Sequence, residues 1–322
     1  MSIKNKGILL FVLLFLWGCR SIFIYDHLVE GTKFSNPKDQ GILNNVEIKE
    51  ASGLVASHYN PHLFWTHNDS GDLPRIFLIN NSGKGRVDFF LKGIKNRDWE
   101  DIGSYVDGSG KSWIYIADIG DNHKQFPSYF IHRFEEPRFE EYLIPNRIIS
   151  SIETIEFTLP DESRDMESLL IDQRTSEVFV VSKREKLKIL YKIPSKKWNI
   201  KVEAEKIQKL KFSVSKSPIS LIQKLYFLTG GSVSSKNDEI ALRNYLEVYY
   251  WKKNKYESIP EALLRKPKSV PSKLEPQGEA VAFAVYENGF YTVSETAQSF
   301  NPVHLYFTEK LADNHQLRKA KQ

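Results

Sequence analysis

Acidic residues recur along the chain at the start of similar short segments. Four glutamates each precede small or aliphatic residues that begin an apolar stretch: Glu50, Glu100, Glu167 and Glu279. If these segments surround one axis, the carboxylates converge and repel each other. Such a group needs a cation, a basic partner, hydrogen-bond donors or raised pKa values. The pattern therefore predicts a site for Ca²⁺ or another divalent cation, which takes oxygen ligands.

A second set of polar residues follows the next apolar stretch of each unit. The predicted metal ligands from this set are Asp69, Asp118 and Glu295. The predicted ligand-binding residues are His67, Asn68, Asp72, Asp121, Asn122 and Tyr245. His67 stands beside Asn68-Asp69, and a neighbouring carboxylate can raise the pKa of a histidine and make it a proton carrier. Such a mixed cluster could bind a metal together with an anion such as a phosphate or carboxylate.

Three interpretations of these residues stay open at this point. The segments 68–72 and 118–122 are also good turn sequences, because their side chains can cap backbone amides. The first interpretation is therefore structural: the polar side chains hold turns, and the glutamates accept hydrogen bonds from the backbone of the neighbouring unit. The second interpretation is a metal-centred site, and the third is a ligand site without a metal. If the protein is a metal-dependent hydrolase, the predicted catalytic residues are Glu100, Glu167, Lys183, Arg184 and Arg243.

Short strands must position these side chains. Runs of β-branched and aromatic residues, such as Arg75–Ile79 and Trp113–Ile116, alternate with turn sequences such as Asn80–Gly83. The units repeat at intervals near the blade length of propellers, about 40–50 residues. We therefore predict an all-β fold, a β-propeller of four-stranded blades, because ring stacking buries both faces of each unit.

Five units can be counted, with room for a sixth in residues 140–165 or 195–225. A degenerate unit begins near Gly231-Ser232, where serine replaces the glutamate. A helix is predicted only near Ile259–Lys266. The last unit lacks an outer strand, and we expect the segment Val46–Ile48 to supply it.

The N-terminus has the features of an export signal. Lys4 and Lys6 precede the uncharged apolar run Ile8–Leu16, which is shorter than the roughly 20 residues of a transmembrane helix. The run ends in Leu16-Trp17-Gly18-Cys19, which resembles the lipobox of bacterial lipoproteins. That resemblance implies cleavage before Cys19 and acyl chains, such as palmitate, on this residue.

The expected organisation follows from that resemblance and from the repeats. It comprises a signal peptide (1–18), a lipidated tether (19–45), a propeller domain (46–310) and a polar tail (311–322). No aspartate follows the cysteine, which favours the outer membrane of the cell envelope over the inner one. Several acyl chains give stable attachment, since each buried methylene contributes about 0.8 kcal/mol.

Composition sets further bounds. The chain has 322 residues, 45 basic and 40 acidic, with a net charge of +5. Its basic stretches lack a nucleic-acid motif, so we expect solvated faces and no nucleic-acid partner. Cys19 is the single cysteine, which excludes a disulfide within the mature domain. We expect a monomer whose partner, besides the membrane, is a small molecule or an envelope protein.

The ordered motifs at 68–72, 98–102 and 118–122 resemble a family of uncharacterised secreted bacterial propellers. The later pieces 165–169, 243–245 and 277–280 fit the same pattern. More remotely, the chain is similar to phytase-like esterase domains and calcium-dependent lactonase propellers. That similarity implies acidic residues around a central metal and hydrolysis of an ester or phosphoester. The sequence thus predicts a propeller that binds a ligand or partner through an acidic central face, with a metal-dependent hydrolase as the alternative.

Overall fold

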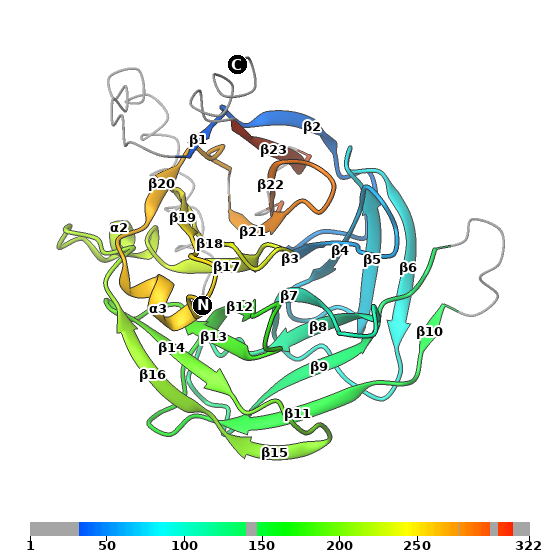
Figure 1. The fold of residues 1–322 in the computed structure, drawn as a ribbon, viewed down its shortest axis with the longest axis horizontal. Helices are drawn as coiled ribbons and strands as arrows, with labels where there is room; N and C mark the ends of the chain where they lie inside the picture. Colours follow the sequence, from blue (N-terminus) through cyan, green and yellow to red (C-terminus); the bar gives the residue numbers. More distant parts are fainter. Residues whose placement is uncertain (1–31, 140–146, 276, 297–301, 312–322) are drawn as a thin grey trace, which may run out of the picture.

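Five small, mainly antiparallel sheets surround a common axis, and Figure 1 shows them in a view down that axis. The computed structural model describes residues 32–139, 147–275, 277–296 and 302–311. The innermost strand of each sheet packs against the inner strands of the two neighbouring sheets, so the ring is closed. The predicted all-β propeller is therefore confirmed, with five blades in the described part of the chain.

Each blade starts at the axis and continues outward. Blade one contains β3 (Ala51–Ala56), β4 (Leu63–Asn68), β5 (Arg75–Asn80) and β6 (Gly85–Leu91). Blade two contains β7 (Trp99–Val106), β8 (Ser112–Asp118), β9 (Tyr129–Glu135) and β11 (Glu153–Thr158). Blade three contains β12 (Met166–Ile171), β13 (Val178–Ser182), β14 (Lys188–Ile193) and β16 (Glu205–Leu210). Blade four contains β17 (Leu228–Val233), β18 (Glu239–Asn244), β19 (Val248–Lys252) and β20 (Lys268–Val270).

The segments expected to hold a sixth blade extend other blades instead. The short strand β10 (Ile148–Ile149) pairs in parallel with β6, and β15 (Ile200–Glu203) pairs in parallel with β11. These additions make blades one and two five-stranded. The loose spacing in the sequence therefore reflects long outer connections.

Blade five is built from both ends of the chain. It contains β21 (Gly278–Phe283), β22 (Gly289–Ser294) and β23 (His304–Leu311), and then the N-terminal strands β1 (Lys33–Phe34) and β2 (Lys38–Ile42), which both pair with β23. The prediction that Val46–Ile48 would close the ring was wrong in position. The closing strand β2 has a largely polar sequence without alternation, and its pairing with β23 overrides this weak propensity.

This closure also moves the domain boundaries. Residues 33–42, which we expected in the tether, belong to the propeller, and Leu311 belongs to β23 rather than to the tail.

Apolar side chains fill each junction between blades. Five separate clusters of buried residues lie one at each junction, and large aromatic residues such as Trp65 and Trp251 are fully buried in them. Full burial of one large apolar side chain contributes roughly 1.5–3 kcal/mol. The ring therefore holds together by blade-to-blade packing.

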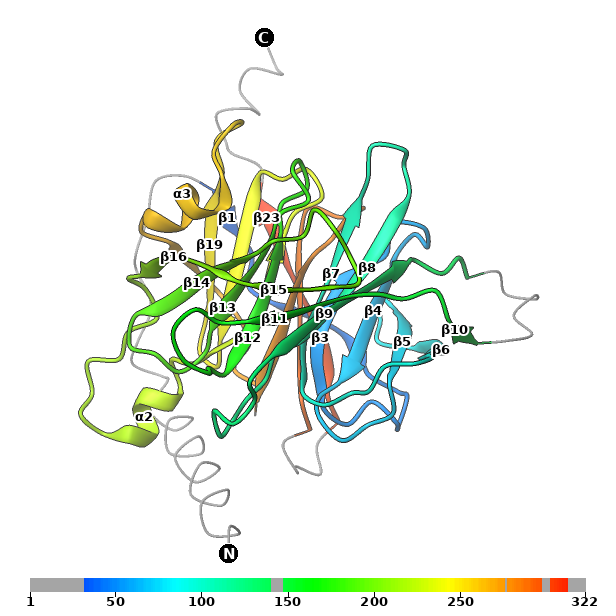
Figure 2. The same cartoon turned by 90° about the horizontal axis from the view of Figure 1, so that it is seen from below.

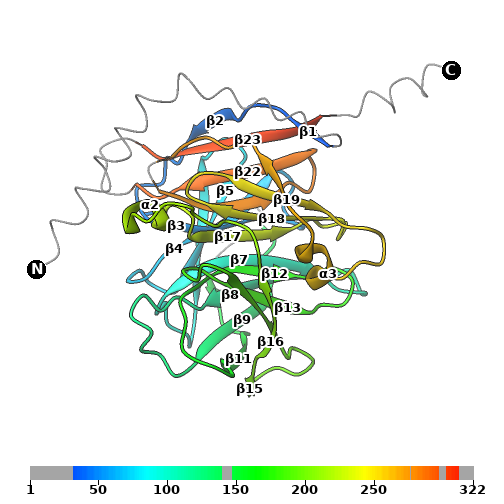
Figure 3. The same ribbon diagram turned by 90° about the vertical axis from the view of Figure 1, so that its left-hand side faces the viewer.

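Two short helices lie at opposite faces of the ring, which Figures 2 and 3 show from the side. Helix α2 (Ser220–Lys224) lies in the connection from β16 to β17. Helix α3 (Ile259–Leu264) connects β19 with β20 and confirms the predicted helix. Ser258 caps α3 through a capping box with Glu261, and a proline stands in its first turn.

Acid is expected to destabilise the fold through His132 in β9. Burial lowers the pKa of His132 to about 4, below its ordinary value of 6.5, and its Nδ1 lies 2.9 Å from Thr154 Oγ1. Between these pH values the unfolded chain takes up a proton that the folded chain does not. The free energy of unfolding should therefore fall by up to about 3 kcal/mol as the pH drops from 6.5 to 4.

Denaturant unfolding of wild type and His132→Gln at several pH values checks this prediction. The variant should show a shallower loss of stability in that range. Equal pH slopes for the two proteins would contradict it.

Candidate functional site: an acidic end of the channel

A β-bulge recurs at one place in every inner strand. The pairing of the first with the second strand shifts at Ala51/Gly53, Trp99/Asp101, Met166/Ser168, Leu228/Gly230 and Gly278/Ala280. The skipped residues, called bulge positions below, are Ser52, Glu100, Glu167, Thr229 and Glu279. Bulges re-aim side chains and are common beside active sites.

Two further sets of residues lie at the same face of the ring. Two residues before each bulge stand the lead positions: Glu50, Asp98, Asp165, Phe227 and Gln277. Directly after each second strand stand the end positions: Asp69, Ile119, Lys183, Tyr245 and Glu295. In four blades the end-position N–H donates to the lead-position carbonyl, at 2.8–3.2 Å. The three sets together form the acidic face.

This register corrects one part of the predicted ring of four glutamates. Glu50 is an exposed lead-position residue, and Ser52 is the true equivalent of Glu100. In blade four the equivalent is Thr229 rather than Ser232. Ser52 and Thr229 each donate their hydroxyl to a backbone carbonyl of the next blade, so they tie blades together.

Carboxylates of blades one, two and three do converge. One carboxylate oxygen from each of Asp69, Asp98 and Glu100 lies within 4.8 Å of the others, and these residues are called the first triad. Glu100, Asp165 and Glu167 meet the same condition and are called the second triad. Glu100 belongs to both, so the two groups are adjacent.

Basic side chains neutralise the second triad. Lys183 pairs with Glu167, and Arg184 Nε lies 2.5 Å from Asp165 Oδ2. Burial would lower the pKa of Lys183, but the carboxylates of Glu100, Asp165 and Glu279 raise it above its usual value. Lys183 is therefore a charged ammonium within a carboxylate cluster.

No basic side chain in the described ranges forms an ion pair with the first triad, although the charge of Lys183 lowers the pKa values of its three acids. Among the described residues, no hydrogen-bond donor reaches the carboxylates of Asp98 and Glu100, which are 7% and 3% exposed. Asp69 accepts one backbone N–H, from Ser70 at 2.5 Å. Burial and neighbouring acids raise the pKa of Asp98 to about 7 and raise the pKa values of Glu100 and Asp69. A cation in contact with all three oxygens would reverse these shifts.

Blades five and four complete the acidic face differently. Blade five adds Glu279 and Glu295, whose pKa values burial raises, and Gln277 Nε2 donates to Glu295 at 2.7 Å. Blade four has Phe227, Thr229 and Tyr245 at the matching positions and contributes no charge. Burial and the nearby glutamates raise the pKa of Tyr245 well above its usual value, so it stays a neutral hydroxyl.

Toward the other end of the channel, a buried acid bonds the backbone of three blades. Asp101 accepts backbone N–H groups from Leu169 at 2.7 Å, Ile102 at 2.9 Å and Gly231 at 3.0 Å, which ties blades two, three and four together. Burial raises the pKa of Asp101, and these three donors oppose that rise. Beyond it, apolar side chains such as Ile171 and Val233 line a narrow cavity. The carboxylates of both triads therefore lie on the acidic-face side of Asp101.

Gly120 lets the loop after β8 approach the first triad. A Cβ on this residue would overlap Glu100 Oε1 and lie 2.5 Å from Asp98 Cγ. Gly120→Ala is therefore expected to displace both carboxylates, to lower calcium affinity roughly tenfold and to destabilise the fold by about 1–3 kcal/mol.

Isothermal titration with calcium and denaturant unfolding measure both effects. Gly108→Ala is the matched control, because nothing lies within 4 Å of a Cβ there. Equal calcium affinity of Gly120→Ala and wild type would show that this loop does not define the site.

Several predicted ligand residues hold the loops of the acidic face. Asn68 accepts the N–H groups of Lys49 and Glu50 and donates to Asp72, which in turn pairs with Arg75. The side chains of these residues are thus satisfied within the protein.

The same holds in blade two. Asp118 pairs with Arg97 at 3.2 Å, and Asn122 accepts from Arg184. Asp121 is fully buried and accepts two backbone N–H groups at 2.8 and 3.0 Å and a tyrosine hydroxyl. The structural interpretation accounts for the contacts of these three residues.

His67 differs from the expectation. It is fully buried in β4, its Nδ1 lies 3.0 Å from the Asn68 carbonyl, and its ring packs edge-on against Trp99. Burial lowers the pKa of His67 to about 4, the opposite of the predicted direction. The imidazole is neutral at pH 7 and is not positioned as a proton carrier.

Arg243 is also buried rather than presented to a ligand. Its guanidinium pairs with Glu275 and donates to the carbonyls of Ala280 at 2.8 Å and Val293 at 2.9 Å. Arg243 therefore supports the junction between blades four and five.

Sequence reasoning missed two of the central acids, Asp98 and Asp165. A signal existed, because the pattern Asp-x-Glu occurs as Asp98-Trp99-Glu100 and again as Asp165-Met166-Glu167. The lead and bulge positions are two residues apart, so this spacing directs both carboxylates to the same end of the channel.

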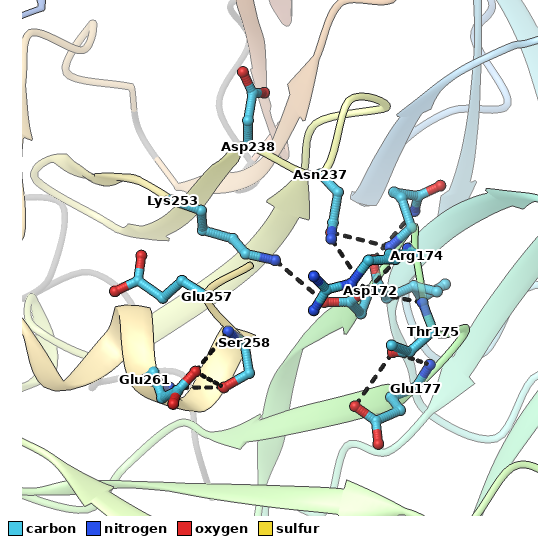
Figure 4. Close-up of polar contacts among 12 residues, drawn as sticks. Asp172, Arg174, Thr175, Glu177, Asn237, Asp238, Lys253, Glu257, Ser258 and Glu261 are labelled. Carbon is cyan, nitrogen blue, oxygen red and sulfur yellow. Dashed lines mark hydrogen bonds and ion pairs between the residues drawn. The ribbon is translucent and has the colours of Figure 1, made fainter. Parts of the chain in front are cut away.

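The opposite face also carries buried charges, but these are paired. Lys253 of blade four lies 3.1 Å from Asp172, which follows β12, and both side chains are almost fully buried. Figure 4 draws this ion pair as a dashed line. Asn237 and the backbone N–H groups of Arg174 and Thr175 also donate to Asp172. Carboxylates without a donor or cation are thus a feature of the first triad and not of every buried acid.

The predicted signal peptide and residues 19–31 of the tether, with the predicted lipidation residue Cys19, lie outside the described residues. None of the helices in the described ranges is long and apolar enough to cross a membrane.

Comparisons with known proteins bear on the fold only. No protein-family model and no curated protein matches the chain. Among solved structures, it is similar to the β-propeller domain of Cps50 (Swd1) from Myceliophteria thermophila, with 8% sequence identity and a TM-score of 0.40. The match covers 86% of this chain and 99% of that one.

Proposed function

We propose that this propeller binds a divalent cation, calcium foremost, in the first triad and holds an anionic ligand at the acidic face through it. The observation that carries the proposal is the pair of buried carboxylates, Asp98 and Glu100, which accept no hydrogen bond and form no ion pair among the described residues, although the charge of Lys183 acts on both from a longer distance. Unpaired buried carboxylates are costly, and a hard cation is the partner that such oxygens suit best.

The ligand set leaves room for a ligand on the ion. Calcium takes about six to eight oxygens, and three carboxylates supply at most six. The remaining coordination positions would be directed toward the acidic face. At the rim stands Arg184, whose side chain is 29% exposed and whose charge favours an anion.

We further propose that the domain works in the cell envelope, anchored through Cys19 as a bacterial lipoprotein. The apolar run and lipobox in the sequence support this. The domain would then meet its ligand outside the cytoplasm, where calcium is available. The finer resemblance to secreted propellers and to calcium-dependent lactonases agrees with such a setting.

Thermal unfolding with calcium or with a chelator tests the cation site. At 100 times the dissociation constant, calcium should stabilise the fold by about 2.7 kcal/mol, which corresponds to a rise of roughly 5–10 °C. Metal analysis should find bound calcium after gel filtration. An unchanged melting temperature together with no bound metal would reject the proposal.

The same protein can be assayed for hydrolysis. Phosphomonoester, phosphodiester and carboxyl-ester substrates, each with calcium and with chelator, test the hydrolase prediction. Chelator-sensitive turnover would extend the proposed binding function to catalysis, whereas a calcium-dependent thermal shift without turnover would leave it a binding site.

A further inference from the structure

The two triads together have the layout of a site for two cations. They share Glu100, and the oxygens of each lie within 4.8 Å of one another. Two neighbouring ions bridged by a common carboxylate would fit this arrangement, as in two-metal sites with ions about 3.5–4 Å apart.

We propose that the ammonium of Lys183 occupies the second cation position, so that the wild-type protein holds one divalent ion and one tethered cation. This inference rests on the proposed function, because it assigns the first triad to the divalent ion. Lys183 pairs directly with Glu167, and its positive charge also lowers the pKa values of Glu100 and Glu279.

Backbone hydrogen bonds fix the position of Lys183, as they fix the positions of the acids around it. Lys183 stands at the end position of blade three, where blade one has Asp69. The backbone N–H of Lys183 donates to the Asp165 carbonyl at 2.9 Å, and the backbone carbonyl of Lys183 accepts from Lys188 Nζ at 2.8 Å. The side chain is 11% exposed, so it is held in the cluster and not in solvent.

Charge explains why one ammonium excludes a second metal. The second triad carries three carboxylates and already has Lys183 and Arg184 beside it. A divalent ion entering there would be repelled by Lys183 at contact distance. Without the lysine charge, the same carboxylates would lack a central cation and would accept a divalent ion in its place.

Counting bound calcium tests the inference. Metal analysis and titration calorimetry should give one ion per chain in the wild type and two in Lys183→Met. Lys186→Met is the matched control, because Lys186 is an exposed lysine on the same hairpin, and this variant should stay at one ion. Lys183→Arg, which keeps the charge, should also stay at one.

The outcomes separate the two proposals. One ion in both wild type and Lys183→Met, or two in the wild type, would overturn the role of Lys183 and leave the cation site standing. No bound ion in the wild type would defeat the proposed function itself. If Lys183→Met does not fold, as judged by circular dichroism, Lys183→Gln provides the same count with a polar side chain.

Discussion

Glu100→Gln is expected to weaken calcium binding at least about 100-fold, which corresponds to about 2.7 kcal/mol. Glu100 is the residue that both triads share, so its loss removes a ligand from the centre of the cluster. The metal-free variant should be as stable as the wild type or more stable. Glutamine has the same shape, and it removes a buried charge whose pKa burial and neighbouring acids raise.

Titration calorimetry and thermal unfolding in chelator measure the two effects of this substitution. The matched control is Glu136→Gln at the opposite face. Glu136 is 2% exposed, and it accepts hydrogen bonds from Trp65 Nε1 at 2.9 Å, from Ser112 Oγ at 2.5 Å and from Ser57. The control should lose stability and keep calcium affinity. The reverse pattern, with Glu100→Gln unstable and calcium binding intact, would assign Glu100 a structural role.

Arg243→Met is expected to destabilise the protein by about 3–5 kcal/mol, the usual effect of removing one partner of a buried ion pair. The side chains of Arg243 and Glu275 are 1% and 3% exposed. Without the guanidinium, Glu275 stays buried and unpaired, and the carbonyls of Ala280 and Val293 lose a donor. Denaturant unfolding in chelator gives this value without a contribution from calcium.

A double variant separates charge from packing. Arg243→Met with Glu275→Gln should recover part of the lost stability, because the unpaired buried carboxylate is gone. A loss below about 1 kcal/mol for the single variant would be typical of an exposed pair and would contradict the buried ion pair.

The fold could be predicted because its signals are local. Strands such as Arg75–Asn80 and Val178–Ser182 are apolar runs bounded by turns, and their repetition indicated blades. The closing strand β2 has no such signal, since Lys38-Asp39-Gln40-Gly41 is recognised as a strand only through its pairing with β23. Strands that form only through pairing with a distant segment therefore could not be predicted from the sequence.

The sequence predicted that acids from several blades would meet at one end of the channel. The structure changes which residue of blade one is equivalent to Glu100. Sequence similarity aligned Glu50 with Glu100, because an acid precedes small residues in both segments, yet the bulges place Ser52 opposite Glu100. The convergence of Glu100 and Glu167 was foreseen and is confirmed. That Arg243 and His67 are buried depends on packing, which residue types alone do not reveal.

The N-terminal closure of blade five also sets an order of events during biogenesis. Lys38 pairs with Glu309, which lies 271 residues later in the chain, so β2 has no partner until β23 has been synthesised. Contacts of such long sequence separation form slowly, because loop closure must precede them. An emerging chain would therefore keep an open ring with an unpaired β22 edge until β23 arrives. We expect chaperones to engage the chain during this interval.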